Sequence, residues 1–152
     1  MSLNEEVELL RRIPLFANIE PSKLKLLAFT SERLTFDSEQ ELFHQGDMGD
    51  AAYIIVEGTA DVIIDTESGP LVVATAKRND IIGEIAILCD VPRTATVKAK
   101  SKLVTLVISK ELFFRLVAEF PQMAVQIMRE LAQRLEQTNV RLREAMNASR
   151  RA

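Results

Sequence analysis

The spacing of hydrophobic residues changes twice along this chain. Up to about residue 29, apolar positions such as Leu3, Val7 and Leu10 recur at helical spacing, with glutamates between them. From about residue 31 to 108 they form short runs separated by turn residues, which is typical of an all-β sandwich or barrel. Helical spacing then returns. We therefore predict a mainly β fold with flanking helices: an N-terminal helical segment at 1–29, a β-roll at 30–108 and C-terminal helices at 109–147.

Turn residues divide the predicted strands. Glu57-Gly58 separates two apolar runs and predicts a tight hairpin in which Gly58 takes a positive φ. Ser68-Gly69-Pro70 predicts a second turn. Further along, Thr94 to Lys100 alternates between polar and apolar residues. This alternation predicts a strand whose inner face carries Ala95, Val97 and Ala99.

The C-terminal region predicts a long helix that pairs with a second copy of the chain. Ser109 is suited to cap a first helix, and Pro121 marks the start of a second, after which no Gly or Pro occurs. Apolar positions in the second helix step by four and three residues, the heptad pattern of a supercoiled helix pair. This seam predicts a homodimer and consists of Ala124, Met128, Leu131, Leu135, Thr138, Leu142 and Ala145.

Composition narrows the classes of function. The 19 basic and 22 acidic residues give a net charge of -3, which argues against nucleic-acid binding through bulk charge. One Cys and one His cannot form an internal disulfide or a His-rich metal site. No apolar run is long enough to cross a membrane, and the N-terminal residues carry no export signal. We therefore expect a cytoplasmic protein that contacts no membrane and needs no cofactor.

One segment, residues 79–97, interrupts the strand pattern. Gly83 allows the backbone to approach another group closely. The following Glu84 to Leu88 predicts one or two helical turns, whose first N–H groups attract anions.

The same segment contains an arginine at an unusual position. If the strand alternation extends back from Ala95, Arg93 lies on the same inward face as Ala95, and its guanidinium points into the β-roll. A buried arginine needs an anionic partner, because an unpaired buried charge is very costly. From the residues alone, that partner is either Glu84 or the phosphate of a ligand.

Two motifs in this chain resemble those of the cyclic-nucleotide-binding domain family. The first matches the family's phosphate-binding cassette at 82–95, and the second is an upstream glycine signature. Together they are specific, and the resemblance extends over about residues 10–145. It implies a jelly-roll sensor domain of the kind found in catabolite activator proteins and protein kinase regulatory subunits. The chain departs from the family at Ile82, where an aromatic residue is usual. The matching residues are Gly83-Glu84-Ile85-Ala86, Pro92-Arg93-Thr94-Ala95-x-Val97 and Gly46-Asp47-x-Gly49-Asp50-x-x-Tyr53-x-Ile55-x-x-Gly58.

The resemblance implies roles for the cassette residues. Arg93 would pair with the charged exocyclic oxygen of a cyclic phosphate. The backbone N–H groups near Ile85, Ala86 and Thr94 would complete the phosphate cradle. Glu84 would accept a hydrogen bond from the ribose 2′-OH, which suits a carboxylate.

The resemblance also implies a purine site. Gly83 would leave room for the sugar, and the purine would lie against the strand that carries Val73 and Ala74. In the long helix, Thr138 and Asn139 match polar residues that reach the adenine in catabolite activator proteins. We therefore favour cAMP as the ligand, with cGMP as the alternative.

A metal-dependent, cupin-like β-barrel enzyme is the main alternative of another class. Such sites usually need two or three histidines, and His44 stands alone. Cys89 has no base assigned to it by the sequence, and we expect it to pack as a small apolar residue. A ligand-free structural or interaction domain of the same fold is a further alternative. We predict no enzymatic activity, no catalytic residue and no metal-binding residue.

The output of such a sensor is the remaining question. A transcription factor would need a helix-turn-helix module after the long helix, and the chain ends at Ala152, too early to form one. We therefore expect a stand-alone sensor without a separate output domain, which does not bind DNA directly and signals to an unknown effector protein through movement of its C-terminal helix.

Overall fold

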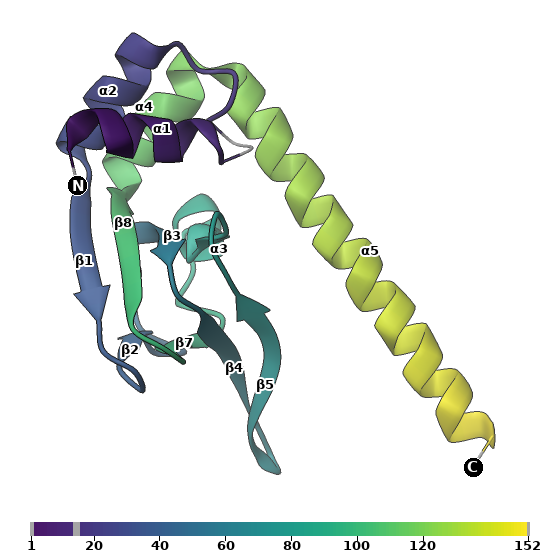
Figure 1. Ribbon diagram of the computed structural model, residues 1–152. Coiled ribbons are helices and arrows are strands. Elements are labelled where there is room, and N and C mark those ends of the chain that lie inside the picture. Colours follow the sequence, from purple (N-terminus) through teal and green to yellow (C-terminus); the bar gives the residue numbers. More distant parts are fainter. Residues whose placement is uncertain (1, 14–15, 152) are drawn as a thin grey trace. The chain divides into compact units, whose positions relative to one another are not determined.

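The computed structural model describes residues 2–13 and 16–151 (Figure 1). The chain divides into two compact units, one up to Arg115 and the other from Leu116 onward. The first unit contains all eight strands and most of the helices. The second is almost entirely the long helix α5 (Pro121–Arg151).

Two helices precede the strands. In α1 (Leu3–Arg11) the side chain of Ser2 accepts a hydrogen bond from the N–H of Glu5 at 3.2 Å, which satisfies one of the donors at the helix start. The second helix, α2 (Pro21–Thr30), begins with a proline, whose fixed φ suits a first helical position. Each helix buries one apolar face, formed by Val7, Leu9 and Leu10 in α1 and by Leu24, Leu27 and Ala28 in α2.

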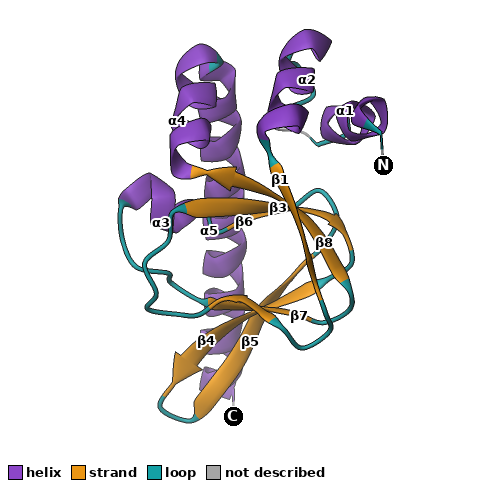
Figure 2. Ribbon diagram, turned by 90° about the vertical axis from the view of Figure 1, so that its left-hand side faces the viewer, coloured by secondary structure: helices purple, strands orange, loops and turns teal. Residues whose placement is uncertain are grey.

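The strands form two antiparallel sheets of four, and the predicted β-roll is confirmed (Figure 2). The first sheet has the order β1-β8-β3-β6 and the second the order β2-β7-β4-β5. The strands are β1 (Glu32–Phe36), β2 (Glu41–Phe43), β3 (Ala51–Glu57), β4 (Ala60–Thr66), β5 (Gly69–Ala76), β6 (Ile81–Ile82), β7 (Thr96–Ala99) and β8 (Leu103–Ser109).

The core is shared between the two sheets. Each sheet buries four residues in one cluster, so the apolar faces cover each other and exclude water. The first sheet contributes Phe36, Ile55, Ile82 and Leu103, and the second contributes Ala60, Ala76, Val97 and Ala99. The small residues of the second sheet leave room for the larger side chains of the first.

The prediction of a hairpin at Glu57-Gly58 is wrong. Gly58 has the expected positive φ of 95°, but β3 and β4 belong to different sheets and do not pair. The connection between β7 and β8 holds this segment instead, because the N–H groups of Lys100 and Ser101 donate to the carbonyl of Thr59. A side chain at Gly58 would meet the carbonyl of Lys102, so this crossing requires glycine.

The second predicted turn is confirmed. Thr66 and Gly69 close the hairpin between β4 and β5, and Gly69 has a φ of 110°. The pairing shifts by one residue along this hairpin: Ile63 lies opposite Val72, and Val62 opposite Ala74. Val73 is therefore the extra residue of a β-bulge, a feature that locally redirects side chains.

Two helices follow the β-roll. In α4 (Lys110–Glu119) the Ser109 hydroxyl accepts a hydrogen bond from the N–H of Leu112 at 3.1 Å, which confirms the predicted cap. After a break at Phe120, α5 runs without interruption over Pro121–Arg151, as the lack of further Gly and Pro predicts. Within the described residues, no helix combines the length and apolar character that a membrane crossing requires.

Candidate functional site

The segment between β6 and β7 folds as the predicted interruption. Gly83 takes a φ of 84°, which lets the chain turn directly from β6 into the short helix α3 (Glu84–Cys89). Asp90 ends this helix in a left-handed conformation with a φ of 54°. The segment then returns toward Gly46 and Asp47, where Arg93 makes two backbone hydrogen bonds: its N–H donates to Asp47 at 2.7 Å, and its carbonyl accepts from Gly46 at 2.9 Å.

Arg93 is buried, as predicted, with 5% of its surface exposed. The strand alternation is nevertheless the wrong reason for its burial, because β7 begins at Thr96 and Arg93 precedes it. Backbone pairing with the turn at Gly46 and Asp47 fixes the position of this residue, and no alternation along a strand is involved.

The guanidinium of Arg93 is held by backbone carbonyls. Nη1 donates to Gly83 at 2.9 Å and Nη2 donates to Ala51 at 2.7 Å. Nε is buried and has no hydrogen-bond partner in the described part of the chain. The sequence suggested a carboxylate or a phosphate as acceptor; both of these hydrogen bonds instead end on carbonyls. A buried N–H donor without an acceptor is unfavourable, and it leaves one edge of this cation able to gain an anion.

An aromatic cluster lies beside the same guanidinium. The Cζ atom of Arg93 lies 4.1 Å from the centroid of the Phe43 ring. The centroids of the Phe43 and Tyr53 rings are 5.8 Å apart. The Tyr53 ring in turn meets the Phe36 ring edge-on, with 6.3 Å between their centroids. The sequence pattern does not indicate a role for Phe43, because β2 has only three residues and is too short to show an alternation.

Burial and charge act against each other at this site. Burial lowers the pKa of the Arg93 guanidinium, while Tyr53, Asp50, Asp47 and Glu84 act to raise it. Burial also raises the pKa of the Tyr53 hydroxyl, and the positive charge of Arg93 partly offsets that effect. For Arg93 the effect of burial is the larger, so the pKa of its guanidinium lies below the ordinary value.

The structure brings several of the predicted residues together. Glu84 is 3% exposed at the start of α3, directly after the Gly83 carbonyl that Arg93 binds. Ala86 is buried in the same helix, whereas Ile85 and Thr94 are exposed.

The predicted purine residues belong to two other elements, β5 and α5. Val73, at the bulge, and Ala74 are exposed on β5, an edge strand of the second sheet. Thr138 and Asn139 belong to the second unit and are exposed on α5. The Thr138 hydroxyl donates to the carbonyl of Arg134 at 2.9 Å, a contact within the helix.

The residues considered for other chemistry are Cys89 and His44. Cys89 is exposed at the end of α3, so the expectation that it packs as a small apolar residue is wrong. His44 is exposed and pairs with Glu41 at 2.8 Å. Within residues 2–13 and 16–151, no three His, Cys, Asp or Glu side chains gather as ligands for a metal ion.

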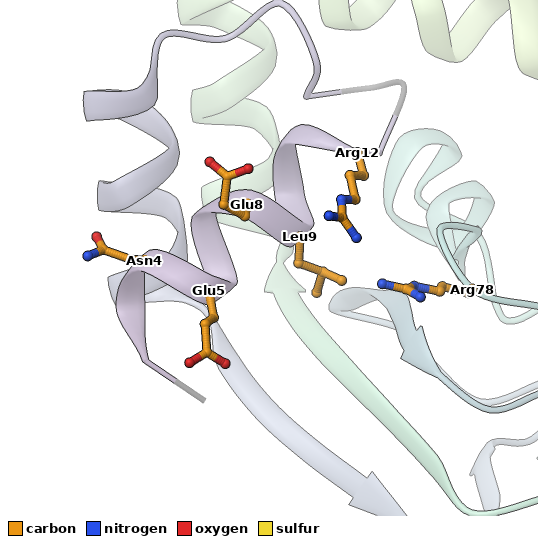
Figure 3. A pocket seen from close by; sticks show the side chains of 6 residues that line it. All are labelled: Asn4, Glu5, Glu8, Leu9, Arg12 and Arg78. Carbon is orange, nitrogen blue, oxygen red and sulfur yellow. The ribbon is translucent and has the colours of Figure 1, made fainter.

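A surface hollow of about 360 Å³ lies between α1 and the loop from β5 to β6 (Figure 3). It contains two acidic and two basic side chains around one apolar residue, and neither Cys nor His. Such a mixture is typical of a solvated helix face and indicates neither a ligand nor a reaction. The hollow is lined by Asn4, Glu5, Glu8, Leu9, Arg12 and Arg78.

The chain is similar in sequence to proteins of one known family. The sequence model of the cyclic nucleotide-binding domain matches residues 33–120. A cAMP-dependent protein kinase regulatory subunit from Yarrowia lipolytica is 36% identical over 108 residues, which cover 71% of this chain and 28% of that protein. A CRP-like cAMP-activated global transcriptional regulator from Mycobacterium tuberculosis is 27% identical over 133 residues, covering 87% of this chain and 59% of that protein.

Solved structures agree with this match. A cyclic nucleotide-binding-like protein from Brucella abortus superposes with a TM-score of 0.64 and 31% sequence identity, covering 75% of this chain and 98% of that one. The present chain spans only about a quarter of the length of the first curated relatives, at 28% and 27% of two kinase regulatory subunits.

Proposed function

The chain belongs to the cyclic nucleotide-binding domain family, and from this premise we propose that it is a cAMP sensor that binds the cyclic phosphate at Arg93. A domain of this family is a regulatory binding module and not an enzyme. The observation that carries the proposal is the buried guanidinium of Arg93 in the cassette at 82–95, whose Nε has no hydrogen-bond partner among the described residues.

Each part of the ligand has a matching group in the proposed site. The exocyclic phosphate oxygen pairs with Arg93, and the N–H groups of Ile85, Ala86 and Thr94 surround the other phosphate oxygens. The Glu84 carboxylate accepts a hydrogen bond from the ribose 2′-OH. The position of Glu84 supports this role, because it is buried at the start of α3, directly after the Gly83 carbonyl that accepts a hydrogen bond from Arg93.

The remaining residues complete the proposed ligand site. Gly83 presents no side chain toward the sugar, and Val73 and Ala74 offer exposed apolar surface to the purine. Thr138 and Asn139 supply polar contacts to the adenine from α5, and this pair is our reason for favouring cAMP over cGMP. Thr94, which could bond a guanine, keeps cGMP as the alternative.

We propose that binding is coupled to movement of the C-terminal helix. The ligand would draw in the segment from Gly83 to Arg93 and shift a two-state equilibrium that an effector protein reads. The seam of α5 would join two copies of the chain in a homodimer. A cytoplasmic location and the lack of direct DNA binding stay predictions.

Isothermal titration calorimetry with cAMP and with cGMP tests the proposal. The protein must first be shown to be folded and free of nucleotide, for example by unfolding, ultrafiltration and refolding. We expect heat of binding for both nucleotides and tighter binding for cAMP. Absence of heat with both would refute the proposed function, and tighter binding of cGMP would refute only the base preference.

A further inference from the structure

Phe43 connects the aromatic core to the buried arginine. It is the last residue of β2 and pairs with Val97 of β7, so its backbone is fixed in the second sheet. Its ring is half-buried against the core and lies tilted by 35° on Tyr53 of the first sheet. The ring also approaches Gly83 closely, since a Cβ built there would lie 3.3 Å from Cε2 of Phe43. Phe43 therefore presents an aromatic surface that is attached to one sheet and packs against the other.

The Arg93 guanidinium rests on this surface. Its Cζ atom is 4.1 Å from the ring centroid, well within the range of a cation–π contact. The hydrogen bonds to Ala51 and Gly83 fix the two terminal nitrogens. Two carbonyls and one aromatic face together restrain both the position and the orientation of the group.

Orientation matters because an arginine recognises a phosphate through a planar fork of N–H donors. Two of the five donors of Arg93 are assigned to carbonyls, and Nε has no partner in the described residues. An anion that binds beside Nε needs this edge of the guanidinium to be aimed correctly before it arrives. Lysine lacks the planar group that an aromatic face can restrain in this way.

We propose that Phe43 is a positioning residue for anion recognition, whose ring sets the plane of the Arg93 guanidinium. This inference rests on the proposed function, because it assigns the arginine to a ligand phosphate. Phe43 acts through Arg93 and contacts no ligand atom in this proposal.

The test compares two substitutions of Phe43 with a matched control. Phe43→Leu removes the aromatic face, and Phe43→Tyr keeps it. Phe36→Leu is the control, because Phe36 touches the same Tyr53 ring but makes no ring contact with Arg93 among the described residues. Thermal unfolding establishes that each variant is folded.

Two measurements are made on each folded variant. The first is cAMP affinity by calorimetry, for which we expect a loss of about tenfold in Phe43→Leu and less than about twofold in Phe43→Tyr and Phe36→Leu. The second is the NMR resonance of the Arg93 Nε–H, identified by its absence in Arg93→Lys. In the ligand-free protein the ring should shift this proton upfield, and Phe43→Leu should abolish that shift while Phe36→Leu preserves it.

The two measurements separate the possible failures. The inference is overturned if Phe43→Leu keeps full affinity, if it loses affinity without a change in the Nε–H resonance, or if Phe43→Tyr loses as much affinity as Phe43→Leu. A wild-type protein that binds neither nucleotide overturns the proposed function instead, and the resonance of its ligand-free form still reports whether the ring orients the arginine.

Discussion

Gly49 lies directly against the guanidinium of Arg93. A Cβ built at Gly49 would stand 2.5 Å from Cζ and 2.9 Å from Nη2 of that arginine, which is closer than non-bonded atoms approach. Gly49 has no positive φ, so backbone strain is not the reason for a glycine at this position. The reason is space: the arginine can stay between its two carbonyl acceptors only if residue 49 has no side chain.

Gly49→Ala should therefore displace Arg93 and weaken nucleotide binding. We expect at least a tenfold loss of cAMP affinity, because the charged fork no longer points at the phosphate. Stability should fall by only about 1 kcal/mol, since the displaced group is the end of a long side chain. Calorimetry and urea unfolding measure the two effects.

The control for this prediction is Gly69→Ala in the hairpin between β4 and β5. Gly69 has a φ of 110° and no atom within 4 Å of its built Cβ, so alanine there introduces backbone strain without displacing a neighbour. We expect Gly69→Ala to lose about 1 kcal/mol of stability and to bind cAMP like the wild type. Equal affinity in Gly49→Ala and the wild type would contradict the packing argument.

Arg93→Ala should weaken cAMP binding by about 2–5 kcal/mol, which is roughly thirtyfold or more, because the phosphate loses its charged partner. Arg78→Ala is the matched control, since it removes the same charge from an exposed position in the loop between β5 and β6. Calorimetry of both variants separates a specific contact from a general change in charge. Similar affinities for the two variants would show that Arg93 does not hold the phosphate.

The sequence predicted the burial of Arg93 but not its surroundings. The motif that flanks it is contiguous and contains the glycine and the short helix that the structure shows. Ala51 and Phe43 lie 42 and 50 positions earlier in the chain, and they meet Arg93 only because strands of both sheets converge on it. A pattern of residues along one segment carries no information about such convergence.

The error at Gly58 has a similar origin. A glycine between two apolar runs fits a hairpin, but it equally fits a crossing from one sheet to the other. The choice depends on which strands pair. β3 pairs with β8 and β6, while β4 pairs with β7 and with its hairpin neighbour β5, and all of these partners except β5 are distant from the turn in the sequence. The local signal correctly predicted the backbone conformation of Gly58 and could not predict its topology.

Glu84→Gln should reduce the affinity for cAMP by about tenfold, because a neutral amide accepts a weaker hydrogen bond from the ribose 2′-OH than a carboxylate does. The same substitution should have little effect on the binding of 2′-deoxy-cAMP, which lacks that donor. Calorimetry with both ligands on both proteins gives the coupling between Glu84 and the hydroxyl. An equal loss for the two ligands would mean that Glu84 stabilises the cassette without contacting the ribose.

The pair of His44 and Glu41 should make the free energy of unfolding depend on pH, with lower stability at higher pH. Its hydrogen bond and charge interaction with Glu41, 2.8 Å away, raise its pKa above the usual 6.5, with smaller contributions from Asp47 and Asp65. The stabilisation is therefore fully present below pH 6.5 and disappears as the pH rises through the higher pKa of the folded protein. The difference in unfolding free energy between the wild type and His44→Gln, measured from pH 5 to 9, should show this decrease.

The ring protons of His44 provide a second measurement of the same effect, because it is the one histidine of the sequence. Their NMR titration should have a midpoint above 6.5 in the wild type, and Glu41→Gln should lower it. A midpoint that does not change in Glu41→Gln would contradict the assigned cause.

The exposed seam of α5 should hold two copies of the chain together. Met128, Leu135 and Leu142 recur every seven residues, and each exposes about 60% of its surface (60%, 62% and 59%). Burying such side chains against a partner helix stabilises a pair by roughly 1.5–3 kcal/mol for each fully buried residue. Sedimentation of the wild type with saturating cAMP should therefore give the mass of a dimer.

Leu135→Glu should convert this dimer to a monomer, since it places a charge at the centre of the seam, where the partner helix would bury it without a counter-ion. Gln133→Glu adds the same charge at an exposed position off the seam, and it should stay dimeric because that position faces solvent in a heptad pair. If the wild type sediments as a monomer at high concentration with ligand, or if both variants dissociate equally, the exposed apolar stripe does not form a helix pair. The distinction also bears on signalling: a seam that forms only with cAMP bound would make dimerisation itself the output of the sensor.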